Sequence, residues 1–133
     1  MGTYCDRTKV ERVGGTQNVS NWAQIDPSWG ATEITAQIAE AREWAYDEIN
    51  LWMANSQYRI PLQTKAGLTP SSIERLAAEL ATVWLLEATG PKGMSPRQDG
   101  HILWARRERC YETLQALQRG KLAIVDAVLG GVA

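Results

Sequence analysis

The side chains most suited to chemistry in this sequence are a repeating set of carboxylates in its first half. Glu33, Glu40 and Asp47 recur every seven residues, with Glu43 beside them. On an α-helix this spacing places the acids on one face, as a di-metal carboxylate bundle requires. Such bundles also use Glu-x-x-His pairs, but the only histidine, His101, has no glutamate three positions before it. The pattern therefore indicates a solvated acidic helix face rather than a metal site.

Other catalytic patterns are absent from the sequence. No Gly-x-Ser-x-Gly nucleophile motif occurs. Cys5 and Cys110 have neither metal-ligand spacing nor a histidine nearby, which favours reduced, structural thiols. Gly93 is followed by Met94, whereas a phosphate-binding loop needs Gly-Lys at that point. We therefore expect no enzymatic activity and no metal or cofactor.

A basic run, ARRER, gives the strongest indication of a nucleic-acid partner. Arg106, Arg107 and Arg109 can contact phosphates, with a flanking aromatic ring stacking on bases. The alternative interpretations are a solvated helix face or a surface complementary to the acidic helix. Sequence-specific DNA-binding proteins usually carry a larger basic excess. DNA binding therefore remains the alternative function.

Length, composition and charge predict one globular domain. The chain has 133 residues, of which 44% are hydrophobic and 22% charged, enough for a core of its own. The net charge of −1 is unevenly divided. Residues 1–89 carry 7 basic and 11 acidic side chains, whereas residues 90–133 carry 7 and 4. Such polarity suits head-to-tail association of identical subunits.

The spacing of apolar residues predicts an all-α fold without a sheet. Asp6 and Thr32 are the expected caps of the first two helices. Thr69 is expected to cap the third with Pro70 at its first position, although Ser71 with Glu74 could also form a capping box there. Gly120 is expected to end the fourth. We expect a small four-helix domain with long loops and an extended C-terminal tail. The predicted helices span about residues 7–13, 33–56, 70–89 and 101–119, and the long loops span 14–31 and 90–100.

Several aromatic and apolar residues are candidates for contacts between subunits. Two tryptophans lie in the predicted loop 14–31, where they either cover the core or meet a partner. A second helical stripe repeats every seven residues beside the main apolar face. It either widens the core or contacts a neighbouring subunit, and we favour the neighbour. The subunit-interface candidates are Trp22, Trp29, Trp44, Leu51, Tyr58, Arg106 and Arg109.

The segment LAIVDAVLGGVA, residues 122–133, is unusually apolar, with nine apolar residues in twelve. Chain ends are usually polar, so this one implies a partner surface. It is too short to cross a bilayer, which takes roughly 20 residues, so we expect no membrane. Its alternation suits strand addition to another chain, although it could instead pack as a short helix on its own domain. The candidate docking residues, expected to be mobile in a free subunit, are Leu122, Ile124, Val125, Val128 and Leu129.

Three sequence blocks, in order, resemble a known family. They are YDEINLWMANSQYRIPL (46–62), TPSSIERLAAELATVWLL (69–86) and RRERCYETLQALQRGKLAI (106–124). The opening TYCDRTKVERVGG (3–15) is also similar, with Asp6 where threonine is expected. With these blocks, the chain resembles the small head–tail adaptor, or head-completion, proteins of tailed bacteriophages.

The resemblance implies a structural role in the neck of a virion that is assembled in the host cytoplasm. It implies an all-helical subunit in a ring, usually of twelve copies, beneath the portal protein. The ring extends the channel through which viral DNA passes without sequence-specific binding, and it docks a stopper or tail-completion protein. Residues 1–120 would form the adaptor domain and residues 121–133 a tail that docks on the portal. The alternative is a small phage DNA-binding module, for packaging or regulation, that uses the basic helix 101–119.

Overall fold

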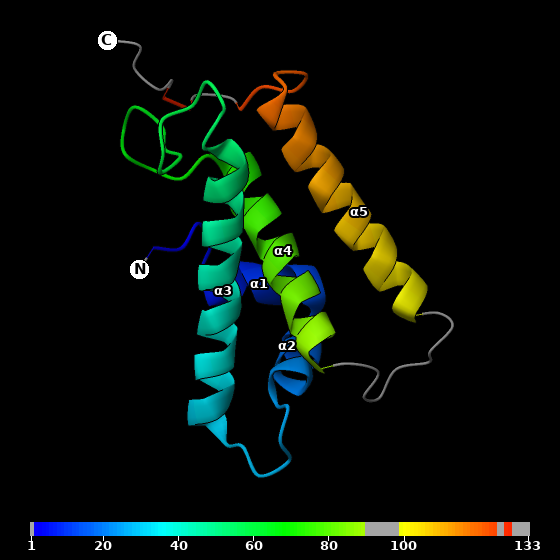
Figure 1. The fold of residues 1–133 in the computed structure, drawn as a ribbon. Helices are drawn as coiled ribbons and strands as arrows, with labels where there is room; N and C mark the ends of the chain where they lie inside the picture. Colours follow the sequence, from blue (N-terminus) through cyan, green and yellow to red (C-terminus); the bar gives the residue numbers. More distant parts are fainter. Residues whose placement is uncertain (1, 90–98, 125–126, 129–133) are drawn as a thin grey trace.

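A computed structural model describes residues 2–89, 99–124 and 127–128 of the chain (Figure 1). These residues contain no strand, only an isolated bridge between Thr64 and Ala127. The all-α prediction is thus confirmed, but the predicted number of helices is wrong, because five are present. They are α1 (Arg7–Gly14), α2 (Thr16–Ala23), α3 (Ala31–Met53), α4 (Ser71–Thr89) and α5 (Asp99–Gln118).

The additional helix, α2, lies within the segment that was predicted to be a long loop. Val19 and Ala23 are fully buried, and Trp22 packs against the core from the same face. Their spacing of three and four residues is helical, but it spans only two turns and follows three polar residues. Gly15, with φ of +91°, ends α1 and separates it from α2. Trp22 therefore packs on this domain's own core.

The central element is α4, which contacts every other helix. In Figure 1, α3 and α5 lie on either side of α4, while α1 and α2 lie behind it. The buried hydroxyl of Thr82 has its hydrogen-bonding requirement met, since it donates to the Ala78 carbonyl at 2.9 Å. The buried residues of α4 are Ile73, Leu76, Ala77, Ala78, Leu80, Ala81, Thr82, Val83, Leu85 and Leu86.

Helix starts agree with the sequence at one of three predicted caps. Asp6 accepts a hydrogen bond from the Lys9 amide at 2.8 Å, which confirms the cap of α1. The N-cap residue of α3 is Gly30 rather than Thr32. The Gly30 amide donates to the carboxylate of Glu33 at 2.9 Å. The start of α4 is shifted as well. The Pro70 carbonyl, not the side chain of Thr69, accepts the first hydrogen bonds of the helix, each at 3.0 Å.

Part of the predicted docking tail packs on the domain itself. Ile124 is only 5% exposed and belongs to the core, and its amide donates to the Tyr58 hydroxyl at 2.7 Å. The Val128 amide donates to the Gln63 carbonyl at 2.8 Å, and the Arg59 amide donates to the Val128 carbonyl at 3.0 Å. The expectation that this tail packs only on another chain is therefore wrong for Ile124 and Val128.

The physical reason is a backbone edge that the sequence does not reveal. After α3, the segment 57–64 offers the Arg59 amide, the Gln63 carbonyl and the Tyr58 hydroxyl to residues 124 and 128. Gly120, with φ of +77°, turns the chain back onto this edge. Leu122 remains 49% exposed, and Val128 is half-buried. Val125 and Leu129 lie outside the described residues.

No helix within the described ranges is both long and apolar enough to span a membrane.

Both cysteine thiols are free and buried, which leads to a prediction about alkaline pH. Burial raises the pKa of the Cys5 thiol from 9.0 to about 11. For Cys110, burial and then the neighbouring Glu79 carboxylate raise the pKa from 9.0 to about 12. Below about pH 9 both the folded and unfolded chains hold these protons. Between about pH 9 and 12 only the unfolded chain releases them, so we expect the free energy of unfolding to fall as pH rises.

Urea unfolding at about pH 8 and pH 10 measures this loss, with Cys110→Ala as the comparison because it removes the larger of the two shifts. The variant's unfolding free energy is expected to depend less steeply on pH. At about pH 8 the native thiols should also react slowly with a disulfide reagent. Reaction at the rate of the denatured chain would contradict their burial.

Candidate functional site

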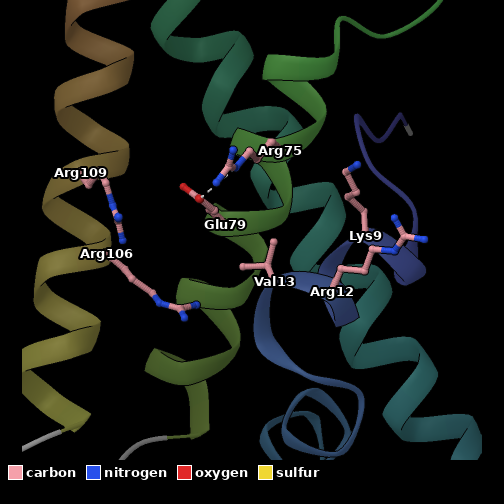
Figure 2. Close-up of a pocket in the computed structure, with 7 residues that line it drawn as sticks. All are labelled: Lys9, Arg12, Val13, Arg75, Glu79, Arg106 and Arg109. Carbon is pink, nitrogen blue, oxygen red and sulfur yellow. Dashed lines mark ion pairs between the residues drawn. The ribbon is translucent and has the colours of Figure 1, made fainter.

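A basic cleft of about 470 Å³ lies between α1, α4 and α5. Figure 2 shows its side chains coming from these three helices and none from α3. Five of the lining side chains are cationic and one is a carboxylate, which gives the cleft a strongly positive potential. The lining residues are Lys9, Arg12, Val13, Arg75, Glu79, Arg106 and Arg109.

Charge inside the basic cleft is only partly neutralised. Arg75 lies 3.8 Å from Glu79, and Lys9 pairs at 3.1 Å with Glu74, which is not a lining residue. Arg106 has a buried guanidinium nitrogen, Nη1, without a hydrogen-bond partner. A buried donor without an acceptor is costly, and more so when it is charged. The cleft is therefore suited to binding an anion.

The basic run of α5 is divided between two surfaces. Arg106 and Arg109 line the basic cleft, but Arg107 does not. Arg107 pairs with Glu87 at 3.1 Å, and its guanidinium lies 5.9 Å from the centre of the Tyr111 ring. The sequence alone did not show this division. It also did not indicate that Lys9, Arg12 and Arg75 join the same cleft.

The predicted stripe of Trp44, Leu51 and Tyr58 is not one surface. Helix α3 ends at Met53, so Tyr58 leaves the helical repeat and becomes buried at 5% exposure. Trp44 is half-buried against the core, whereas Leu51 is 71% exposed. The prediction of a continuous stripe is therefore wrong, because it carried the helical repeat on to residue 58, whereas α3 ends at Met53.

Trp29, the other loop candidate, lies between α2 and α3. It is half-buried, and its carbonyl accepts a hydrogen bond from the Gln24 side chain at 2.8 Å. Its amide donates to the Asp26 carbonyl at 2.9 Å. These hydrogen bonds order the connection between the two helices. Trp29 lies outside the group of partly buried residues that pack against the core cluster.

An apolar end is formed at the C-terminal end of α3 and α5, where the segment 54–70 meets residues 119–124 and 127–128 (Figure 1). Six large hydrophobic side chains are exposed within the described residues. Four of them belong to these segments or to the last turn of α3. Exposed apolar side chains gathered at one end of a domain can mark an interaction site. We call this surface the apolar end. Its exposed residues are Leu51 at 71%, Leu68 at 67%, Leu122 at 49% and Ile60 at 38%.

The carboxylates of α3 form an acidic face on the side opposite the core. Glu33, Glu40 and Asp47 are exposed and Glu43 is half-buried, while Ile38, lying between them in sequence, faces the core. No ion pair joins any of these four acids to another described side chain. This agrees with the predicted solvated acidic face.

Within the described ranges, no three His, Cys, Asp or Glu side chains gather closely enough to hold a metal ion. His101 lies in the first turns of α5, and its side chain is outside the description.

Comparison with known proteins gives no relative: no protein-family model, curated protein or solved structure matches this chain.

Proposed function

We propose that this protein is a structural adaptor of the phage head–tail type, which binds a portal ring and docks the next neck component. The resemblance of the three sequence blocks motivates this proposal. The observation that carries it in the structure is the apolar end, where Leu68 and Leu122 stay 67% and 49% exposed. An adaptor that holds two protein assemblies together needs such a surface.

The first and third blocks meet at or near the apolar end. Tyr58, from the first block, accepts a hydrogen bond from the amide of Ile124, at the end of the third. In the same region, Trp52 and Tyr111 both donate to the Glu48 carboxylate, at 3.3 and 3.1 Å. The residues that carry the resemblance thus support the surface that we assign to docking.

The energy available at the apolar end fits repeated attachment around a ring. Burying apolar surface contributes roughly 25 cal/mol per Å², so two or three leucines contribute a few kcal/mol before the ordering costs of association. One subunit would therefore bind weakly. A ring of subunits bound to a symmetric partner gains from multivalency, which converts weak contacts into firm attachment. Because Ile124 and Val128 are already bonded to their own domain, this part of the tail loses less conformational entropy on binding than a free tail would.

Portal binding by a double variant, Leu68→Ser with Leu122→Ser, tests this proposal. Both side chains are largely exposed, so we expect an unchanged melting temperature but at least tenfold weaker binding to the portal protein encoded with this chain. Sedimentation velocity with and without portal rings measures the binding. Ile25→Ser is the matched control, because Ile25 is 40% exposed but lies between α2 and α3. Equal portal binding by the double variant and the wild type would contradict the proposal.

A further inference from the structure

Two surfaces of opposite charge remain unsatisfied in the described structure. The basic cleft has five cations for one carboxylate and a buried guanidinium nitrogen without an acceptor. The acidic face of α3 has four carboxylates without an ion pair. The two surfaces belong to different elements, because α3 contributes no residue to the cleft.

We propose that the basic cleft of one copy binds the acidic face of α3 from a second copy. Carboxylates are the natural partners of guanidinium groups, since two parallel hydrogen bonds form between them. The exposed guanidinium groups of Arg12 and Arg109, which line the cleft, are the donors that a glutamate or aspartate of the neighbouring copy would meet. The contact is held by complementary charges rather than by apolar packing. Its affinity therefore falls as ionic strength rises.

The geometry of the acidic face suits a cleft bordered by helices. Glu40, Glu43 and Asp47 are three and seven residues apart, so they project from one side of α3. At 1.5 Å per residue they span about 10 Å along the helix axis. Trp44 and Leu51 flank this stripe, half-buried and 71% exposed respectively. Trp44 provides an apolar contact at the edge of the interface, whereas Leu51 belongs to the apolar end.

The resulting arrangement is head to tail. Because the cleft and the acidic face are different surfaces, each copy can engage one neighbour through each of them. Such heterologous contacts build either a closed ring or an open filament. This inference rests on the proposed function for the expectation that the contact closes into a ring, but the contact itself does not depend on a portal.

A second copy fits the cleft better than a nucleic-acid duplex does. A duplex presents phosphates over an extended surface, whereas the cations here line a concave site on three helices. Arg107, which would extend the basic surface along α5, is already paired with Glu87. The chain also carries a net charge of −1, and the acidic face repels phosphate.

Mixing two complementary variants tests the inference. Arg12→Gln with Arg109→Gln weakens the cleft only, and both of these side chains are exposed without an ion pair, so folding is preserved. Glu40→Gln with Asp47→Gln weakens the acidic face only. Matched controls that change the same charge elsewhere are Lys65→Gln with Arg119→Gln, and Glu108→Gln with Glu112→Gln. Sedimentation velocity at low ionic strength measures association of the full chain.

The wild type is expected to associate in a concentration-dependent way that added salt reverses. Each variant alone should associate about tenfold more weakly, while the controls behave as the wild type. Mixed in equal amounts, the two variants should form a one-to-one dimer, because only one intact cleft and one intact acidic face remain to meet. A carbodiimide, which joins amines to nearby carboxylates, should give more cross-linked dimer with the wild type than with either variant alone.

Three results would overturn the inference. The first is a wild type that stays monomeric at every soluble concentration and low salt. The second is self-association that both variants retain. The third is duplex DNA binding that Arg12→Gln with Arg109→Gln abolishes while self-association is absent, which assigns the cleft to phosphates. None of these outcomes changes the portal-binding result, because Leu68 and Leu122 lie in neither charged surface.

Discussion

Removing residues 121–133 is expected to lower the free energy of unfolding by about 2–5 kcal/mol, the range for emptying a buried isoleucine site. Ile124 is 5% exposed and contacts the core cluster, and its amide caps the buried Tyr58 hydroxyl. Truncation leaves a cavity and removes the partner of that hydroxyl. It also removes the backbone bonds that Val128 makes with Arg59 and Gln63. Urea or thermal unfolding of the two chains measures the difference.

Two single substitutions separate the contribution of Ile124 from that of the remaining tail. Ile124→Ala should account for most of the loss in unfolding free energy. Leu122→Ala is the matched control, because Leu122 is 49% exposed, and such surface changes usually stay within about 0.5 kcal/mol. A truncated chain that melts at the temperature of the full chain would contradict the structure. It would restore the simpler view of a tail that serves only a partner.

Leu114→Ala is expected to have an effect of similar size, about 2–5 kcal/mol. Leu114 is fully buried, and with Cys110 and Leu117 it forms the described contact of α5 with the core. Because α5 carries two cleft arginines and leads into the tail, this packing holds both functional surfaces in position. The denaturant midpoint should fall while the slope of the transition stays the same.

Gln115→Ala provides the comparison for Leu114→Ala, since Gln115 follows Leu114 on α5 and is exposed. Its denaturant midpoint should remain close to that of the wild type. The Leu114→Ala chain, studied where it is still folded, should also associate less at low salt, because Arg106 and Arg109 lose their fixed position. Equal denaturant midpoints for the two variants would show that α5 is not packed through Leu114.

Local sequence determined most of the helical structure. In α3, Ile38, Ala41 and Ala45 recur at helical spacing, and the carboxylates between them point away from the core. Such periodicity needs no knowledge of the neighbours, because an apolar stripe is stable only when it is buried. The cap at Asp6 was also predictable from the sequence, because its side chain accepts from an amide only three residues further along the chain.

Helix α2 shows where local information was too weak. Its two turns bury only Val19 and Ala23, with Trp22 beside them, and a helix this short is unstable alone. Packing against α1, α3 and α4 supplies the stability. Similarly, the heptad that joined Trp44, Leu51 and Tyr58 assumed a helix longer than α3 is, because the sequence did not mark its end at Met53.

The candidate sites depended most on tertiary structure. Sequence identified Arg106, Arg109 and the acidic residues of α3 as charged surfaces, but Lys9, Arg12 and Arg75 reach the same cleft only because α1 and α5 both pack on α4. The tail shows the same limit. Its apolar character was evident from the sequence, yet whether Ile124 meets this chain or another depended on the backbone edge beside Tyr58. Periodicity reports which face of an element is apolar or charged, whereas its partner is decided by contacts between residues far apart in the chain.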